Sequence, residues 1–161
     1  HPDASVVFIG PCASKKLEAS RRTVRSDVDF VITFEELTGM FEAKGILLEE
    51  IQAMDEMKDA TAAGRGYGVA GGVASAIEEC INKYYPGTEV KIEHAESLAE
   101  CKKMLLLAKA GKKNGCLIEG MACPGGCIAG AGTNIALPQA VKEVNKFKDA
   151  AEKKVPDMIE E

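Results

Sequence analysis

Short apolar runs alternate with longer amphipathic segments along most of this chain. Residues 6–9, 30–33 and 116–118 are apolar enough for buried strands, and residues 89–94 alternate apolar and polar side chains as a strand does. Segments with helical spacing of apolar residues separate them. This order predicts an α/β fold with a largely parallel sheet flanked by helices. Ligands of such folds bind beyond the carboxyl ends of the strands, so the loops there are the first candidates for a functional site.

The expected helix ends are marked by capping signals and glycines. Thr33 with Glu36, and Ser97 with Glu100, form two potential capping boxes, in which each side chain satisfies a backbone amide of the first turn. We predict helices over residues 34–43, 73–84, 98–110 and 137–154, and a shorter one within residues 46–58. The glycine-rich residues 64–72 are predicted to form a loop.

Length, charge and hydropathy bound the class of protein. The 161 residues suffice for one domain with a core, and 46% hydrophobic residues are ordinary for a globular protein. A net charge of −5 argues against a nucleic-acid partner, because phosphate binding needs clustered Lys and Arg. No apolar run reaches the roughly 20 residues of a membrane span, so no membrane partner is expected. The chain starts at His1 without Met, which indicates a piece of a longer protein.

Cysteines are the main carriers of chemistry in this sequence. Six are present: Cys12, Cys80, Cys101, Cys116, Cys123 and Cys127. A disulfide framework does not suit a chain of this length and apolar content, so reduced thiols in a cytoplasmic protein are expected. Cys80 and Cys101 fall on apolar helix faces and Cys116 begins a strand, which favours core packing for these three. The other three lie in predicted loops and are candidate metal ligands.

The strongest local pattern is Glu-Gly-Met-Ala-Cys-Pro-Gly-Gly-Cys, from Glu119 to Cys127. Its two cysteines, Cys123 and Cys127, suit an iron–sulfur cluster, because the glycines let the backbone approach sulfide and point amides at it. Zinc is the competing metal, but zinc sites more often use Cys-x-x-Cys or mixed Cys and His sets. His94 is expected to be a surface residue or a hydrogen-bonded core residue. Iron–sulfur is therefore preferred to zinc.

A second pattern lies in the turn after the first predicted strand. Here Cys12 is followed by Lys15 and then by Glu18, each three residues further along. The lysine could form a cationic pocket beside an anionic cofactor. On its own, the pattern would be interpreted as a buried cysteine beside surface lysines.

The glycine-rich loop at residues 64–72 raises the question of nucleotide binding. Its spacing is not Gly-x-x-x-x-Gly-Lys-Ser/Thr, and no clear strand precedes it. A tight turn packed near the site is therefore favoured over a phosphate-binding loop.

Taken together, these segments resemble the C-terminal domain of the large subunit of iron-only ([FeFe]) hydrogenases. One family motif, Pro-Cys-x-x-Lys-x-x-Glu, is matched from Pro11 to Glu18. Another, Glu-x-Met-x-Cys-x-x-Gly-Cys, is matched from Glu119 to Cys127. The resemblance runs in order over nearly the whole chain. It implies that residues 1–161 are the C-terminal portion of the catalytic domain, and form one lobe of it.

The resemblance also implies a cofactor, a [4Fe–4S] cubane joined through a cysteine sulfur to a two-iron centre. Cys12, Cys123 and Cys127 would be cubane ligands, with Cys127 bridging to the two-iron centre. Lys15 would donate a hydrogen bond to a cyanide ligand of that centre, Glu18 would hold Lys15, and Met121 would pack against the two irons. The implied activity is reversible hydrogen oxidation and proton reduction. Implied partners are the upstream half of the domain and a ferredoxin-like electron-transfer domain or protein.

Several departures from the family pattern shape the expectations. The family's first motif, Thr-Ser-Cys-Cys-Pro, would lie upstream of His1 and supplies the fourth cubane ligand. We therefore expect the piece alone to be inactive, to hold the cofactor incompletely or not at all, and to self-associate through apolar surface. Gly10 stands where well-studied members have Met, and Ala131 and Thr133-Asn134 also differ, as in the divergent, hydrogen-sensing branch.

Two other interpretations remain open. The alternative is a relative of the iron–sulfur assembly type, with a cubane and no two-iron centre. Retention of Lys15 and Met121 argues against it, since the family uses both only at that centre. The last is an α/β module with structural cysteines and no metal.

Overall fold

The computed structural model describes residues 3–24, 27–52 and 58–157, and the chain divides into two compact units. Unit 1 comprises His1–Glu56 together with Ala129–Ala136. Unit 2 comprises Met57–Ile128 together with Leu137–Glu161. After Ile128 the chain contributes eight residues, Ala129–Ala136, to unit 1 before it continues in unit 2. These eight residues are called the returning segment, and each unit is described by itself below.

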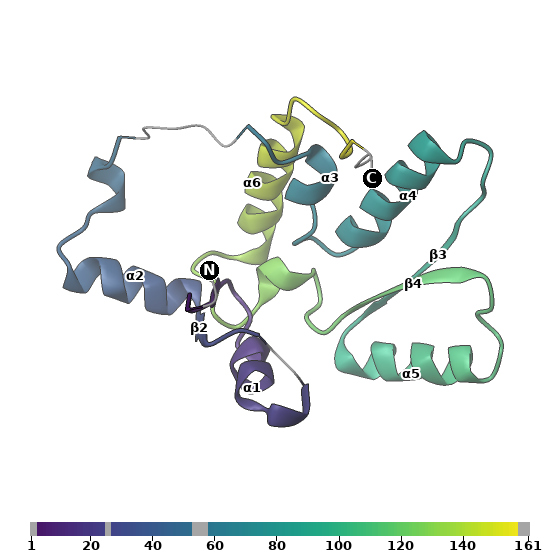
Figure 1. The fold of residues 1–161 in the computed structure, drawn as a ribbon, viewed down its shortest axis with the longest axis horizontal. Coiled ribbons are helices and arrows are strands. Elements are labelled where there is room, and N and C mark those ends of the chain that lie inside the picture. The colour runs from purple at the N-terminus through teal and green to yellow at the C-terminus, as the bar shows by residue number, and fades with distance from the viewer. Residues whose placement is uncertain (1–2, 25–26, 53–57, 158–161) are drawn as a thin grey trace. The chain divides into compact units, whose positions relative to one another are not determined.

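Unit 1 is built on a short parallel strand pair. Strand β1 (Val7–Ile9) pairs in parallel with β2 (Phe30–Ile32), with Val7 opposite Phe30. Between the strands run helix α1 (Ser14–Ser20) and a 3-10 turn (Arg22–Val24), and α1 packs against β2 (Figure 1). After β2 come helix α2 (Phe34–Ala43) and a 3-10 turn (Leu48–Glu50). A parallel pair needs a crossover of this kind, because a hairpin turn would make the strands antiparallel.

The start of α2 shows why this segment becomes helical where it does. Glu36 N donates to Thr33 Oγ1 at 3.2 Å, and Thr33 N donates to Glu36 Oε2 at 2.9 Å. The predicted capping box is therefore confirmed in both directions. Thr33 is buried, and the returning segment lies against it, since a Cβ added at Gly132 would stand 2.4 Å from Thr33 Cβ.

Unit 2 contains the second parallel strand pair and the longer helices. Strand β3 (Lys91–Glu96) pairs with β4 (Cys116–Met121), with Lys91 opposite Cys116 and Glu96 opposite Met121. Helix α5 (Leu98–Lys109) connects them and packs beside both (Figure 1). The remaining helices are α3 (Ala62–Arg65), α4 (Gly72–Tyr84) and α6 (Leu137–Asp149). Helix α3 packs on α4 and α6, and α4 packs on β4.

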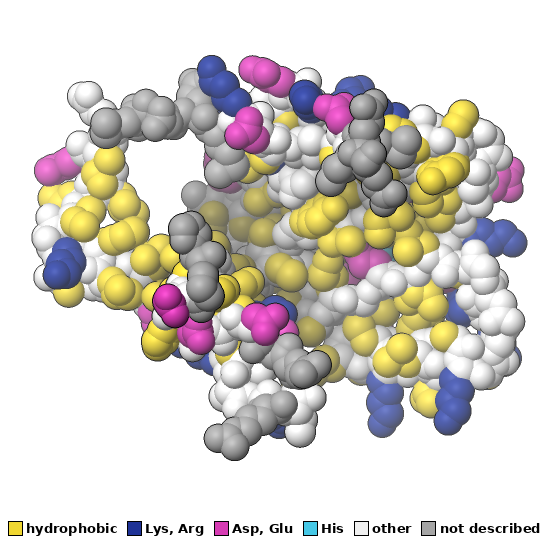
Figure 2. Space-filling view, viewed as in Figure 1, with side chains coloured by type: hydrophobic (Ala, Val, Ile, Leu, Met, Phe, Trp, Pro, Cys, Tyr) yellow, Lys and Arg dark blue, Asp and Glu magenta, His cyan; other side chains and the backbone are white. Residues whose placement is uncertain are grey.

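The core of the described chain is made mostly of small side chains. Its buried apolar residues are Ala63, Ala74, Ala76, Ala95, Met121 and Ala140. Large apolar side chains remain at the surface, among them Leu98 and Leu105 of α5, which are 74% and 68% exposed. Figure 2 shows apolar side chains over much of the surface in that view. Large apolar side chains exposed in this number are typical of a surface that associates with another protein surface.

The predicted fold class is confirmed, with corrections of detail. The strands are parallel and flanked by helices, but the described residues form two separate two-stranded sheets, so β1 and β4 are not in one sheet. Sequence spacing could not reveal this, because strand pairing is set by contacts distant in sequence. Two strand predictions shift at their ends, since β3 begins two residues later than expected and β4 continues to Met121.

The helix predictions differ from the structure at four places. Helix α3 (Ala62–Arg65) was missed, and its last two residues fall in the predicted loop at residues 64–72. Helix α1 was missed, because Ser14–Ser20 has no capping side chain at its start. Helix α6 ends at Asp149, five residues before the predicted end. Within residues 46–58 the structure has only the 3-10 turn, and residues 53–57 lie outside the described residues. At Ser97 half of the predicted box forms: Glu100 N donates to Ser97 Oγ, while the Glu100 carboxylate accepts from Glu96 N instead.

Within the described ranges, none of the helices combines the length and the apolar character needed to cross a membrane.

Candidate functional site

The loop that carries Cys123 and Cys127, called the cysteine loop, begins where β4 ends in unit 2. After Met121 the chain turns back on itself, with Gly126 N donating to the carbonyl of Cys123 at 3.0 Å, and then enters a 3-10 turn, Cys127–Ala129. Gly125 and Gly126 have φ of +91° and +95°, a conformation that side-chain-bearing residues rarely adopt. These two glycines therefore allow the tight bend between the two cysteines.

The cysteine loop lies directly against the glycine-rich segment at residues 64–72. A Cβ added at Gly126 would stand 2.4 Å from Ala70 N and 2.5 Å from Gly68 O. Ala70 N donates to Gly125 O at 3.1 Å, and Ile128 N donates to Gly68 O at 3.1 Å. The prediction of a tight turn packed near the site is confirmed, and the packing is close enough to exclude any side chain at Gly126.

The sulfur-containing residues of this loop differ in burial. Cys127 is exposed and Cys123 is half-buried, whereas Met121 is only 9% exposed. Cys127 Sγ lies 4.0 Å from Met121 Sδ. The six cysteines, all of which fall in the described ranges, form no disulfide. Thiolates are soft ligands that suit iron–sulfur clusters.

Glu119, two residues before Met121 in the chain, is almost fully enclosed. Its carboxylate accepts hydrogen bonds from the amides of Gly71 (2.6 Å), Val73 (3.1 Å) and Ala74 (3.0 Å) at the start of α4. His94 Nδ1 lies 3.3 Å from the same carboxylate. These amides are the groups that a phosphate would need at this helix start, so the structure argues against nucleotide binding there.

The pKa of Glu119 reflects two opposing causes. Burial raises it, but the hydrogen bonds from the amides of Ala74 and Gly71 and the contact with His94 stabilise the charged form, and the net pKa is lowered from 4.5. The side chain is therefore an anion held in place at neutral pH. His94 is half-exposed and contacts this anion.

A second carboxylate holds the tip of the cysteine loop. Glu96, opposite Met121 in the strand pair, accepts from Gly125 N through Oε2 at 2.7 Å. Ser97 N also donates to Met121 O at 2.8 Å. Sequence analysis did not single out Glu96 or the role of Glu119. The available signal was an acidic residue at the end of each of two predicted strands, next to a glycine-rich loop.

The other predicted ligand, Cys12, lies in unit 1 in the turn between β1 and α1. It is half-buried, and Lys15 in the following helical turn donates to both carboxylate oxygens of Glu18 at 2.9 and 2.7 Å. The returning segment meets this turn, since Gly132 N donates to Pro11 O at 2.9 Å. Thus Cys12, Lys15 and Glu18 form one local group, as the motif spacing suggests.

The three remaining cysteines lie where packing roles were expected. Cys80 is on α4, Cys101 on α5 and Cys116 at the start of β4, and all three are half-buried. Cys101 Sγ lies 3.6 Å from Ala95 O and 3.7 Å from Met121 O, so it packs against the ends of both β3 and β4.

The predicted metal ligands are divided between the two units, with Cys12 in unit 1 and Cys123 and Cys127 in unit 2. No group of three or more Cys, His, Asp or Glu side chains is gathered as a metal site within the part of the chain that the structure describes.

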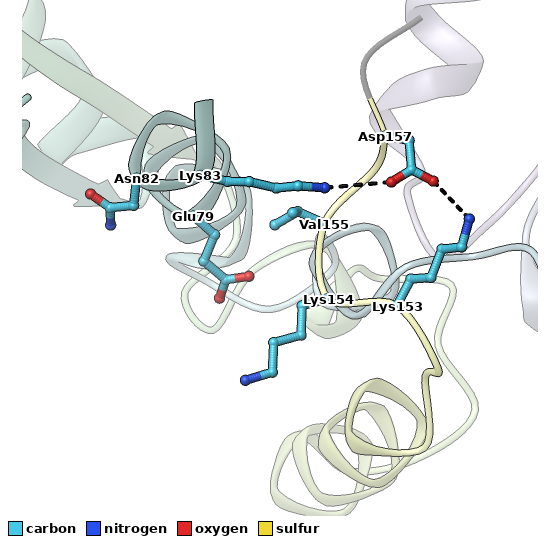
Figure 3. Close-up of a pocket in the computed structure, with 7 residues that line it drawn as sticks. All are labelled: Glu79, Asn82, Lys83, Lys153, Lys154, Val155 and Asp157. Carbon is cyan, nitrogen blue, oxygen red and sulfur yellow. Dashed lines mark hydrogen bonds and ion pairs between the residues drawn. The ribbon is translucent and has the colours of Figure 1, made fainter. Parts of the chain in front are cut away.

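A pocket elsewhere in unit 2 has a volume of about 640 Å³. It lies between α4 and residues 153–157 (Figure 3), and no cysteine lines it. Asp157 bridges two of its lysines, with Oδ1 3.5 Å from Lys83 Nζ and Oδ2 2.7 Å from Lys153 Nζ. Its walls therefore carry side chains of both signs of charge.

Comparison with known proteins decides the family. A family model described as iron only hydrogenase large subunit, C-terminal domain, matches residues 1–131. The chain belongs to this family. The match includes both cysteine motifs, so the iron-only hydrogenase assignment rests on the same residues as the site described above.

Curated relatives agree with this assignment. The chain is 30% identical to the periplasmic [Fe] hydrogenase large subunit of Nitratidesulfovibrio vulgaris, over 87% of this chain and 41% of that protein. It is 27% identical to iron hydrogenase 1 of Clostridium pasteurianum, over 86% of this chain and 30% of that protein. The chain therefore spans less than half of these iron-only hydrogenases. Because one relative is named as periplasmic, family membership does not fix the predicted cytoplasmic location.

Solved structures share the fold. An [FeFe]-hydrogenase variant from Chlamydomonas reinhardtii superposes with a TM-score of 0.59 at 22% identity, over 94% of this chain and 55% of that one. A structure describing oxygen inactivation of an [FeFe]-hydrogenase gives a TM-score of 0.59 at 21% identity, over 95% of this chain and 55% of that one. These similarities show that the predicted α/β fold, with parallel strands flanked by helices, is shared.

Proposed function

We propose that this chain forms one lobe of an iron-only hydrogenase catalytic domain that catalyses or senses the interconversion of hydrogen with protons and electrons. In this proposal Cys12, Cys123 and Cys127 are ligands to a [4Fe–4S] cubane, and Cys127 links the cubane to a two-iron centre. The family assignment and the two complete cysteine motifs support the proposal.

The geometry of the cysteine loop is the observation that carries the proposal. Two thiols flank a bend built from two left-handed glycines, and the thiol of Cys127 is exposed beside the buried thioether of Met121. Soft sulfur donors on a glycine-lined bend fit an iron–sulfur cluster, because the backbone can approach the sulfides without side chains in the way. Three thiolates are one short of a cubane's ligand set, and the fourth must come from outside this chain.

The remaining motif residues have roles that follow from their chemistry. Lys15 provides an ammonium group for an anionic cyanide ligand, and its contacts with both oxygens of Glu18 hold it at the turn that carries Cys12. Met121 presents an apolar sulfur that excludes water from the cofactor side of the loop. The bound cofactor supplies the redox chemistry, and the protein binds it and sets its surroundings.

Partners of this lobe must cover its exposed apolar surface. We propose that the upstream half of the catalytic domain does so in the full-length protein, and that a ferredoxin-like domain or protein supplies electrons. The piece by itself is expected to be inactive and to self-associate, because side chains such as Leu98 and Leu105 then stay in water.

Reconstitution of the full-length protein with iron, sulfide and the two-iron precursor tests the function. We expect infrared bands of iron-bound carbonyl and cyanide, together with hydrogen evolution or uptake. A cubane without those bands would instead indicate the assembly-type relative. No bound iron or sulfide at all would mean that the cysteines are structural.

A further inference from the structure

Glu119 has no assigned role, yet it is the most heavily bonded acidic side chain near the cysteine loop. Its two oxygens accept from three backbone amides at the start of α4 and contact His94, and the residue is 9% exposed. A carboxylate of this kind stabilises a helix start, since it satisfies amides that have no partner within the helix. Here, however, the carboxylate comes from a strand 45 residues or more away in the chain, so it joins two elements.

This contact fixes the end of β4 from which the cysteine loop departs. Glu119 and Met121 belong to the same strand, and Cys123 follows two residues after Met121. The α4 start also continues directly from the glycine-rich segment that supports the loop tip at Gly125 and Gly126. Glu119 therefore ties the base of the cysteine loop to the surface on which its tip rests.

The bonding pattern fits an anchor better than a proton carrier. A relay residue must gain and lose a proton easily near neutral pH. The hydrogen bonds from the amides of Ala74 and Gly71 and the contact with His94 outweigh the effect of burial, and the pKa of Glu119 is lowered. Because the charged form is favoured, the side chain stays an anion at neutral pH and keeps its hydrogen bonds to the amides.

We propose that Glu119 is a positioning residue that joins the end of β4 to the start of α4 through its hydrogen bonds. In this way it presets Cys123 and Cys127, which means that it holds them in positions suited to the cubane before metal binds. This inference rests on the proposed function for the identity of the cluster. The presetting itself is a property of the chain without metal, and it can be measured there.

The experiment measures alkylation of each cysteine in the metal-free, full-length protein by mass spectrometry. Glu119→Gln keeps the size of the side chain but places an amide N–H group against backbone N–H groups. We expect Cys123 and Cys127 to react about tenfold faster, the factor that corresponds to losing roughly 1.4 kcal/mol of restraint on the loop. Cys80 and Cys116 should react at the wild-type rate, which shows that the fold persists.

The matched control is Glu93→Gln, which removes a carboxylate from the same strand pair. Glu93 pairs with Lys113 at 2.5 Å rather than with the α4 start, so this variant should label like wild type. After cubane reconstitution, the electron paramagnetic resonance spectrum should be altered in Glu119→Gln and unchanged in Glu93→Gln. A merely stabilising role of Glu119 would not alter that spectrum once the variant is folded.

The outcomes separate this inference from the proposed function. Equal labelling of Cys123 and Cys127 in wild type and Glu119→Gln would overturn the positioning role even if the wild type binds a cubane. Faster labelling in a protein that binds no cubane would keep the positioning role and overturn the proposed function. If Glu119→Gln exposes all cysteines, Glu119→Asp replaces it, and labelling of the two loop cysteines at the wild-type rate would again overturn the role.

Discussion

At the scale of single residues, two adjacent lysines in α1 have different partners. Lys15 contacts both oxygens of Glu18 within the helix, whereas Lys16 bonds the Glu36 carboxylate at 2.8 Å and the carbonyl of Val31 at 3.2 Å. Lys16 therefore connects α1 to β2 and α2, whereas Lys15 bonds a residue of its own helix. This difference separates a structural lysine from a candidate functional one.

Replacing Lys15 tests that separation. The Lys15–Glu18 pair is exposed by 42% and 40%, so Lys15→Ala should change the free energy of unfolding by less than about 1 kcal/mol. Under the proposed function the same change should abolish hydrogen turnover in the reconstituted full-length protein. Lys16→Ala is the matched control and should retain turnover. Equal turnover in the two variants would contradict the role given to Lys15.

Glu119 gives a prediction about acid stability. Its folded-state pKa is lowered from 4.5, so its stabilising contribution is fully present above that value and is lost as pH falls through the lower folded-state value. Glu119→Gln should lower the free energy of unfolding by about 1–3 kcal/mol at neutral pH. Denaturant titrations should show this difference between wild type and variant shrinking as the pH falls below 4.5. A difference that stays constant with pH would mean that the carboxylate charge does not stabilise the fold.

At the scale of elements, the cysteine loop depends on glycines for two separate reasons. Gly126 needs a positive φ, and it also lies against the backbone of residues 68–70 with no room for a Cβ. Gly87, in the turn after α4, has a similar φ of +89° but nothing within 4 Å of an added Cβ. The two positions therefore separate backbone strain from steric overlap.

Alanine substitutions at these glycines should differ clearly. Gly87→Ala should cost about 1–2 kcal/mol, the penalty of a left-handed conformation alone. Gly126→Ala should cost about 2–5 kcal/mol, because steric overlap adds to that penalty, and it should also weaken cubane binding. Thermal unfolding and iron content of the two variants check this. Similar losses at both positions would show that the loop is not pressed against the glycine-rich segment.

The sequence predicted elements well where local chemistry sets them. The Thr33 capping box and the helix after the glycine-rich segment formed where expected, since both depend on neighbouring residues. Helix α1 was missed because it has no capping signal, and β4 was predicted too short because the charged Glu119 ends its apolar run. The clamp of Glu119 on α4 was also missed, as it joins residues distant in sequence.

At the scale of the whole molecule, the division into two units could not be predicted from periodicity. The chain contributes Ala129–Ala136 to unit 1 and the preceding cysteine loop to unit 2, and only packing reveals that exchange. The motifs identify the candidate ligands, but sequence spacing does not show whether Cys12 lies near Cys123 and Cys127 in space. Their convergence on one cluster is a prediction about the two units and the metal together.

Loss of cubane in single cysteine variants tests that convergence most directly. The measurement is iron and acid-labile sulfide per chain, with the paramagnetic resonance spectrum, in full-length protein carrying Cys12→Ser, Cys123→Ser or Cys127→Ser. Each variant should lose the same cubane signal, because each removes one thiolate from a shared set, while Cys80→Ser should keep it. A Cys12→Ser protein that retains the full cubane signal lost in Cys123→Ser would contradict the account.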